Sequence, residues 1–499
     1  MSLKAYLSYP FAKLIVYQNS KWKNNAVNCQ KKTMLKLVDK AKNTLFGVDH
    51  SFSQIKNYSD FKKNIPVRDY EDLKQYVTKI INGDNDVLWP GKPIYFCKTS
   101  GTTSGEKYIP ISKESMPYHI KSAKDAILSY ISETRNTSII NGKMIFLQGS
   151  PVLSKTGTIL TGRLSGIVAH HIPAYLKKNR LPSFKANSID DWELKVDAIV
   201  EETVAENMSI ISGIPPWVQM YFEKLRKKTG GLIKDIFPNF NLFIYGGVNF
   251  EPYKKTFENI IGKKIAGIEL YPASEGFIAY QDSQKEEGML LCVNHGIFYE
   301  FIESEDFFNK NPKRIDLSEV KVGINYVIIL NTNAGLWGYN IGDTVKFVSV
   351  NPYRIIVSGR IKHFTSAFGE HVIAEEVELS LKKTIEKLPA SINEFHVSPQ
   401  VQPEKGLPYH EWLIEFEKKP ENNLEFKKLL DENLQNQNSY YKDLIQGSVL
   451  QGLQITIIKK NGFRKYMKTI GRLGGQNKVP RLSNDRKIAD TLKEINEDE

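Results

Sequence analysis

The stretch FCKTSGTTSGEKYIP, residues 96–110, says more about the fold than any other part of this chain. Within it, seven consecutive residues, 99–105, are each hydroxylic or glycine. Hydroxyls and bare backbone N–H groups are the donors that a polyphosphate needs, and glycine lets the backbone approach an anion closely. Lys107 adds a positive charge just after the loop. Apolar and aromatic residues at 94–96 and 108–109 predict two strands, so that the loop joins a hairpin.

This loop differs from the P-loop of nucleoside triphosphatases. That motif needs glycine, four residues and then Gly-Lys-Ser/Thr, and it runs directly into a helix. Here three residues separate Gly101 from Gly105, and Glu106 stands before Lys107. Serine, threonine and glycine are also typical of a flexible surface loop, so the loop alone leaves both interpretations open.

Composition indicates a globular protein of more than one domain. A chain of 499 residues exceeds a single core, and its 41% hydrophobic and 25% charged residues are ordinary values. No apolar run reaches the roughly 18 residues of a membrane helix, and the first ten residues lack the apolar stretch of a signal peptide. We therefore expect a cytoplasmic protein without a membrane partner.

Charge and cysteine usage exclude further classes. The formal charge is +12, but the lysines are scattered and no nucleic-acid motif is present, so we expect no nucleic-acid partner. An anionic substrate such as ATP would account for part of the excess. Three widely spaced cysteines, Cys29, Cys97 and Cys292, argue against a disulfide framework or a zinc site and fit a reducing compartment.

Strand and helix patterns alternate between residues 188 and 271, which predicts a parallel sheet. The expected elements are a helix capped by Ser188, a strand at 209–212, a helix at 215–228, a strand at 242–245, a helix at 251–261 and a strand at 265–271. Ligands bind at the carboxyl ends of such strands. Gly246-Gly247 and the turn at 272–275 lie at two of these ends.

The rest of the chain completes an α/β fold class. Residues 1–90 and 119–132 are mostly helical in pattern, and five strand patterns between 289 and 358 predict an antiparallel β-barrel or sheet. Later patterns predict helices near 374–388 and 424–436 and strands near 393–398, 411–416 and 453–458. We expect a large N-terminal domain, residues 1–359, of parallel and mixed sheets with helices plus the barrel. Residues 360–499 then form a small α+β C-terminal domain.

Two carboxylates are candidate ligand-binding groups. Glu275 follows a predicted strand, where a carboxylate opposite a phosphate loop suits Mg²⁺. Asp343 follows Gly342 and can accept hydrogen bonds from both ribose hydroxyls. Taken alone, the first also fits a solvated loop and the second a hairpin turn. The histidines show neither metal-ligand spacing nor a catalytic triad, and no Gly-x-Ser-x-Gly elbow is present.

Five motifs stand in the order found in the adenylate-forming superfamily, which includes acyl-CoA synthetases and luciferases. They are the loop at 99–107, Tyr271–Gly276, Gly342-Asp343, Gly359-Arg360 and Lys478. The chain more closely resembles the auxin-responsive (Gretchen Hagen) acyl-acid–amido synthetases of plants and their bacterial relatives, and is identified as a bacterial member. This closer resemblance runs from about residue 10 to 485 and is carried by 271–276, 336–343, 367–371 and 475–481.

The resemblance implies a role for each matched residue. Phosphates would be held by Ser100, Gly101, Thr102, Thr103 and Lys107. Gly246 and Gly247 would flank the adenine, Tyr271 and Ser274 would line the adenylate site, and Asp343 and Arg360 would hold the ribose. Glu275 would bind Mg²⁺, Lys478 would neutralise charge during adenylation, and Lys362 would be the hinge of a mobile C-terminal domain. Trp217 and Tyr221 are our candidates for the acyl pocket, and both also fit ordinary core packing.

The resemblance also implies a reaction. An ATP- and Mg²⁺-dependent ligase would adenylate a carboxylic acid and transfer the acyl group to an amino acid, releasing AMP. An acyl-CoA ligase with the same first step and a catalytically silent binder of nucleotide or acyl groups are the alternatives. The family usually has arginine where this chain has Gly338 and Asn340, and neither residue can replace a guanidinium. The sequence does not define the oligomeric state.

Overall fold

The computed structural model describes the following residues: 3–100, 106–173, 178–189, 191–247, 250, 253–361, 364–365, 372–446, 449–474, 478–483 and 485–497. The chain divides into two compact units. Unit 1 comprises Met1–Ile214, Lys227–Gly247 and Ile265–Val357, and unit 2 comprises Pro215–Arg226, Val248–Lys264 and Ser358–Glu499. The sequence did not indicate that residues 215–226 and 248–264 group with the C-terminal part, because local patterns carry no information about distant contacts.

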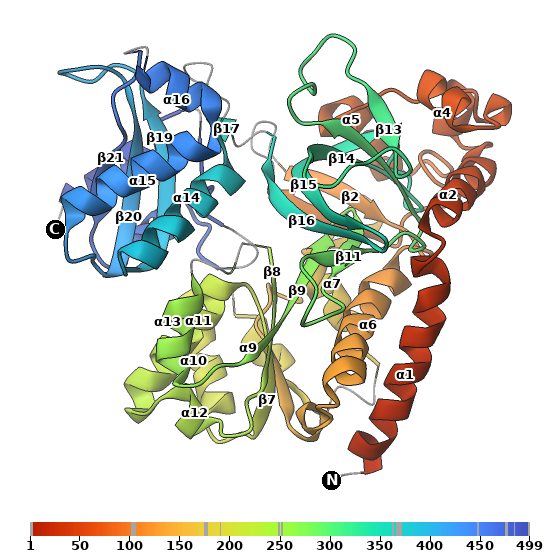
Figure 1. Ribbon diagram of the computed structural model, residues 1–499. Helices are drawn as coiled ribbons and strands as arrows, with labels where there is room; N and C mark the ends of the chain where they lie inside the picture. Colours follow the sequence, from red (N-terminus) through yellow and green to blue (C-terminus); the bar gives the residue numbers. More distant parts are fainter. Residues whose placement is uncertain are drawn as a thin grey trace. The chain divides into compact units, whose positions relative to one another are not determined.

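A twelve-stranded mixed sheet runs through unit 1 (Figure 1). Its strand order is β13-β12-β14-β15-β16-β11-β10-β9-β8-β7-β3-β6. The strands are β3 Lys143–Phe146, β6 Arg180–Leu181, β7 Met208–Ser212, β8 Leu242–Gly246, β9 Ala266–Ala273, β10 Gly276–Tyr280, β11 Met289–Leu291, β12 Ile297–Glu303, β13 Arg314–Asp316, β14 Asn325–Thr332, β15 Tyr339–Val350 and β16 Tyr353–Arg360.

The direction of these strands confirms the predicted α/β class. β6, β3, β7, β8 and β9 are parallel to their neighbours, as the alternating strand and helix patterns indicated. β9, β10 and β11 pair antiparallel, as do β13, β12, β14 and β15. The antiparallel strands continue the same sheet, and the pairings among the described residues do not close them into the barrel that we expected.

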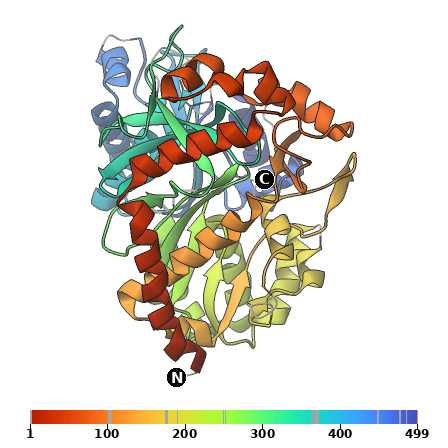
Figure 2. The same ribbon diagram turned by 90° about the vertical axis from the view of Figure 1, so that its right-hand side faces the viewer.

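A smaller sheet and several helices complete unit 1. The small sheet has the order β2-β1-β5-β4, with β1 Tyr95–Ser100, β2 Glu106–Ile111, β4 Ser154–Thr156 and β5 Ile159–Gly162. The helices are α1 Leu3–Lys23, α2 Ala26–Ala41, α3 Leu45–Asp49, α4 Tyr58–Asn64, α5 Tyr70–Ile81, α6 Met116–Thr134, α7 Leu164–His170, α9 Phe184–Asn187, α10 Trp192–Thr203 and α12 Ile233–Ile236. Helices α1 and α6 lie side by side (Figures 1 and 2).

One helix start differs from the prediction. We expected Ser188 to cap the helix before β7, but the Ser188 hydroxyl donates to the Phe184 carbonyl at the end of α9. Asp191 is the N-cap of α10, since its carboxylate accepts from the Leu194 amide at 2.9 Å. Asp191 stands three residues after Ser188, and serine and aspartate are about equally good N-caps.

Unit 2 is built on the three-stranded sheet β19-β20-β21, with β19 Ser391–Gln400, β20 Tyr409–Lys418 and β21 Gln454–Ile458. Helices α14 Ala374–Lys387 and α15 Asn423–Gln437 cover one face of this sheet (Figure 1). Further helices are α13 Lys254–Ile261, α16 Ser439–Gln446, α17 Gly462–Thr469 and α18 Lys487–Glu497, and α11 Pro215–Thr229 contributes its first part. None of the helices in the described ranges combines the length and the apolar character of a membrane span.

Candidate functional site

The loop rich in hydroxyls and glycine joins a hairpin, as predicted. β1 and β2 pair antiparallel, and Ser100 faces Glu106 at the end of the ladder. Gly101, Thr102 and Thr103 lie outside the described residues, as does the Ser100 side chain. The ladder holds both ends of the loop together, and the contacts of the loop with phosphate stay a prediction.

Cys97 connects this hairpin to the second motif. Its buried thiol donates to the Ser274 hydroxyl, with 3.1 Å between Sγ and Oγ. Burial raises the pKa of Cys97 to about 12, its hydrogen bond with Ser274 opposes that rise, and the negative charge of Glu275 adds to it. Ser274 and Glu275 form the turn between β9 and β10. The structure therefore brings the phosphate hairpin and the predicted Mg²⁺ ligand into one neighbourhood.

A second contact adds the third motif. The hydroxyl of Tyr271, on β9, donates to Oδ2 of Asp343, on β15, at 2.6 Å, and both side chains are buried. Asp343 lies where the pairing of β14 with β15 shifts register, next to Gly342 at φ +84°. The Asn340 carboxamide accepts from the Gly342 amide at 2.8 Å and stabilises this irregular backbone. Motifs separated by about seventy residues in sequence thus meet at one hydrogen bond.

The two glycines after β8 have a structural reason of their own. Gly246 pairs with Leu270 in the parallel ladder, and a Cβ on Gly246 would lie 2.2 Å from the Leu270 carbonyl oxygen. Gly247 has φ +86°, a region that favours glycine. Close strand packing therefore explains Gly246, and the role of both residues beside an adenine stays a prediction.

The predicted basic residues are described to different extents. Lys107 lies on β2, with its ammonium 5.7 Å from the centre of the Tyr70 ring. Arg360 is the last residue of β16, but its side chain is not among the parts that the structure describes. Lys362 lies outside the described residues. Lys478 is exposed and belongs to unit 2. Their roles in nucleotide binding and domain motion stay predictions.

The segment that carries Lys478 is fixed by a residue that sequence reasoning missed. Arg481 is buried and forms ion pairs with Glu394 and, at 3.3 Å, with Glu378. It also donates to the Tyr253 hydroxyl at 2.7 Å. All of these residues belong to unit 2. The motif at 475–481 had indicated the segment, but nothing in the sequence indicated which acids would pair with it.

Backbone hydrogen bonds hold the same segment on β19. The Val397 amide donates to the Arg481 carbonyl at 2.8 Å, and the Ser483 amide donates to the Val397 carbonyl at 3.0 Å. The imidazole of His396 adds a contact of 2.7 Å to the Pro480 carbonyl. Residues 478–483 therefore follow the sheet edge instead of forming a loose loop.

The missing family arginines have a steric explanation at position 338. Gly338 has φ +58°, and a Cβ there would lie 2.2 Å from the Pro66 carbonyl oxygen. The backbones of Gly338 and Asn340 hydrogen-bond that of Arg68, at 2.8 Å in each case. An arginine at position 338 would require the segment around Pro66 to move away.

Two further features are described separately. Trp217 and Tyr221, on α11, are buried, which fits packing as well as a pocket wall, so their acyl-binding role stays a prediction.

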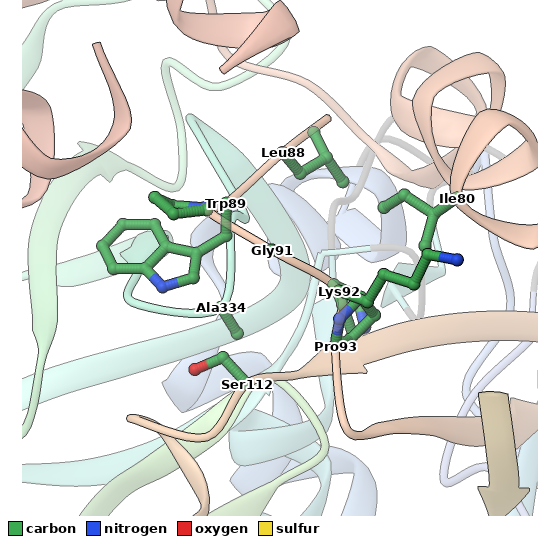
Figure 3. Close-up of a pocket in the computed structure, with 10 residues that line it drawn as sticks. Ile80, Leu88, Trp89, Gly91, Lys92, Pro93, Ser112 and Ala334 are labelled. Carbon is green, nitrogen blue, oxygen red and sulfur yellow. The ribbon is translucent and has the colours of Figure 1, made fainter. Parts of the chain in front are cut away.

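A small pocket lies next to the hairpin (Figure 3), lined by Ile80, Leu88, Trp89, Pro90, Gly91, Lys92, Pro93, Pro110, Ser112 and Ala334. None of the predicted site residues lines this pocket.

Several solved structures share the fold of this chain. The GH3.15 acyl acid amido synthetase matches with a TM-score of 0.78 at 15% identity, over 96% of this chain and 95% of that one. AtGH3.15 acyl acid amido synthetase in complex with 2,4-DB gives 0.79 at 16%, over 97% and 96%. A 2-hydroxyisobutyryl-CoA ligase in the postadenylation state gives 0.57 at 12%, over 94% and 91%. The fold is that of adenylate-forming ligases.

Family models then specify the group within this class. The GH3 family N-terminal domain matches residues 18–184, the GH3 family central domain residues 290–360, and the GH3 family C-terminal domain residues 375–487. The chain belongs to the GH3 family, so the predicted family is confirmed and the bacterial source stays a prediction. ATP use is implied by this membership.

Named relatives are plant enzymes at low identity. Jasmonoyl–L-amino acid synthetase JAR4 of Nicotiana attenuata is 24% identical over 64% of this chain and 67% of its own length. Indole-3-acetic acid-amido synthetase GH3.15 of Arabidopsis thaliana is 24% identical over 58% of this chain and 60% of its own. The chain thus aligns with about two thirds or less of these relatives. The predicted class, an acid–amino acid ligase, is the class that their names give.

Proposed function

We propose that this chain is an AMP-forming acid–amino acid ligase. In the first step a carboxylate oxygen attacks the α-phosphorus of ATP, which forms an acyl-adenylate and expels pyrophosphate. In the second step the amine of an amino acid attacks the acyl carbon, which forms the amide and releases AMP. The protein contributes alignment of the reactants and neutralisation of charge at the phosphates.

One observation carries the proposal: three motifs distant in sequence are joined by two hydrogen bonds. Cys97–Ser274 attaches the phosphate hairpin to the Tyr271–Gly276 motif, and Tyr271–Asp343 attaches that motif to the Gly-Asp strand. The phosphates and the ribose belong to one nucleotide, and Mg²⁺ binds to its phosphates. Residues proposed to bind these groups must therefore lie together. Unrelated loops would not need to share these contacts.

The residues present fit a magnesium nucleotide. Within the described ranges no group of three or more His, Cys, Asp and Glu side chains is arranged for a metal. Mg²⁺ usually takes one or two protein carboxylates and completes its shell with phosphate oxygens and water, so Glu275 suffices as a protein ligand. Bound there, Mg²⁺ would offset negative charge on the phosphates. Ser100, Thr102 and Thr103 would donate to the same phosphates, and Asp343 would accept from the ribose.

The proposed substrates are a small carboxylic acid and an amino acid. The relatives are named for jasmonate and indole-3-acetate, and one solved structure holds 2,4-DB. Trp217 and Tyr221 favour an aromatic or aliphatic acid if they line the acyl pocket. A bacterial source stays part of the proposal on the sequence resemblance alone. Three free cysteines support a cytoplasmic location.

We also propose that residues 360–499 act as a mobile domain that turns about Lys362 between the two steps. Lys478 would then act in adenylation only. Replacing Lys362 by proline fixes one backbone angle. The proposal expects Lys362→Pro to spare one half-reaction and to impair the other, whereas equal loss of both would contradict it.

Product mass spectrometry tests the function. The protein is incubated with Mg-ATP, a panel of aryl, indolyl and fatty acids, and either mixed amino acids or CoA. An N-acyl amino acid together with AMP, lost in Glu275→Ala, is the expected result, and Glu286→Ala on an exposed loop is the matched control. An acyl-CoA product would move the acceptor to a thiol. Absence of AMP with every acid would favour a silent binder.

A further inference from the structure

Arg180 is a partly buried cation that has no assigned role in binding the nucleotide. It lies on β6, opposite Met144 of β3, and its Nη2 donates to the Gln148 side-chain oxygen. The guanidinium also lies over the Phe146 ring, 4.8 Å from its centre. Among the described residues, no carboxylate lies within ion-pair distance of Arg180.

The most deeply buried arginines are compensated by acids, whereas Arg68, partly buried like Arg180, contacts the His50 ring nitrogen and the Phe46 ring. Arg314 pairs with Glu300 at 2.9 Å and Arg354 with Asp282 at 2.5 Å. At Arg180 the cation is taken partly out of water and faces an amide and a ring, and this burial lowers its pKa to about 10. A desolvated charge costs free energy unless an opposite charge meets it. Arg180 is only partly buried, so part of its side chain stays in contact with solvent.

Arg180 begins β6, and its guanidinium reaches Gln148 beyond the end of β3. Gln148 lies two residues beyond the end of β3, at the carboxyl edge of the parallel strands β6, β3 and β7. Ligands of open α/β sheets bind at this edge.

A chain of contacts leads from Gln148 to the nucleotide motifs. The next residue, Gly149, donates its amide to the Ser165 hydroxyl at 3.2 Å, and its Cα faces the Arg163 side chain. The neighbouring Leu164 backbone hydrogen-bonds the Cys97 thiol, which in turn contacts Ser274. Arg180 and the nucleotide motifs therefore belong to one connected edge of unit 1.

We infer that Arg180, oriented by Gln148, binds a substrate carboxylate that the reaction does not consume. This inference rests on the proposed function. The carboxylate that is adenylated loses its charge in the first step, so a fixed guanidinium on it would stabilise the reactant and oppose the reaction. The α-carboxylate of the acceptor amino acid keeps its charge throughout, as would a second carboxylate on the acid. Arginine suits either, because its planar fork matches a carboxylate.

The test compares each acceptor amino acid with its carboxamide, in wild type and Arg180→Gln. Wild type is expected to prefer the amino acid by about 10- to 100-fold in kcat/KM, the range for a charged hydrogen-bonded pair. Arg180→Gln should reduce that preference to about 1, with unchanged acid-dependent ATP–pyrophosphate exchange. Gln148→Glu should do the same, because an intramolecular ion pair would occupy the guanidinium without removing it. Arg135→Gln is the control, at an arginine that also lies near a ring, that of Tyr9.

Each remaining outcome has a definite meaning. If the acceptor preference survives while the KM for a dicarboxylic acid in exchange rises in both variants, Arg180 binds the second carboxylate of the acid. If neither preference nor KM changes in variants that unfold at the wild-type temperature, the inference is overturned and Arg180 serves packing alone. Failure of the proposed function would be evident earlier, because wild type would then show either no acid-dependent exchange or no amide product with any amino acid.

Discussion

The Tyr271 hydroxyl donates to the Asp343 carboxylate at 2.6 Å in the interior of unit 1. This bond fixes the carboxylate that we assign to the ribose. Tyr271→Phe removes the donor and keeps the ring. We expect the KM for ATP to rise about tenfold, in line with the loss of one hydrogen bond to a charged group.

Exchange kinetics at varied ATP measure this effect. Tyr76→Phe is the matched control, because Tyr76 also donates to an aspartate, Asp49, at 2.9 Å and lies outside the site. Both variants should lose a similar amount of unfolding free energy, about 1 to 2 kcal/mol. An equal rise in the KM for ATP in both would contradict a specific role for Tyr271.

We expect that placing the family's arginine at position 338 destabilises this protein. Gly338→Arg adds a side chain at φ +58° and places its Cβ against the Pro66 carbonyl. Backbone strain and overpacking together should lower the free energy of unfolding by about 3 kcal/mol. Gly230→Ala separates the two causes, because Gly230 has φ +76° with open space around it, and should cost only about 1 kcal/mol. Equal losses in urea denaturation would exclude the clash with Pro66.

Thiol labelling reports on the contact between the hairpin and the Tyr271–Gly276 motif. Cys97 is buried and its pKa is raised to about 12, so almost no thiolate forms near pH 8. Cys29 is partly exposed; burial raises the pKa of its thiol, and the nearby charge of Lys32 lowers it. Iodoacetamide should modify Cys29 first in native protein and all three cysteines in denaturant. Rapid native labelling of Cys97, located by peptide mass spectrometry, would mean that its contact with Ser274 opens readily.

Much of the architecture is local and could be predicted. The alternating strand and helix patterns gave β7, β8 and β9 to within two residues, and the loop residues gave the hairpin β1–β2. Apolar periodicity and turn residues encode these elements within short windows. The order of the motifs then indicated the family before any contact was known.

Pairings between distant residues could not be predicted. Nothing near Cys97 in sequence indicates Ser274, and nothing near Arg481 indicates Tyr253. A closed barrel is not confirmed, and strand patterns alone do not specify which strand edges pair. The residues of the site could be assigned roles only through the family resemblance. The contacts between these residues became known only from the three-dimensional structure.

Two buried histidines predict a pH dependence of stability. Burial lowers the pKa of His119 to about 4, and burial with a contribution from Lys121 lowers that of His295 to about 3. In the unfolded chain both would titrate near 6.5, so the unfolded state binds more protons below that value. Their stabilising contribution is complete above pH 6.5 and is lost as the pH falls toward 4. Each should add a slope of roughly 1.4 kcal/mol per pH unit.

Urea denaturation between pH 6.5 and 5 measures that slope, above the range where ordinary carboxylates titrate. His119→Leu removes one titrating group and should reduce the slope by roughly 1.4 kcal/mol per unit. His170→Gln, at an exposed histidine, is the control. An unchanged slope in His119→Leu would show that water reaches this ring in the folded protein.

We expect that loss of Arg481 both destabilises unit 2 and slows adenylation. Arg481→Met leaves Glu394 and Glu378 without their shared cation and should destabilise the protein by about 3 kcal/mol. It should also lower adenylation, because it releases the segment that carries Lys478. Arg486→Met is the matched control, since Arg486 pairs with Glu411 at 2.7 Å in the same unit and outside that segment.

A double-mutant cycle separates positioning from stability. Lys478→Ala alone should slow ATP–pyrophosphate exchange about 100-fold, the effect of losing one group that stabilises transition-state charge. In the Arg481→Met background the same change should cost less than about tenfold, because Lys478 is already misplaced. In the Arg486→Met background it should still cost about 100-fold. Additive effects of Lys478→Ala and Arg481→Met would show that Arg481 stabilises unit 2 without orienting Lys478.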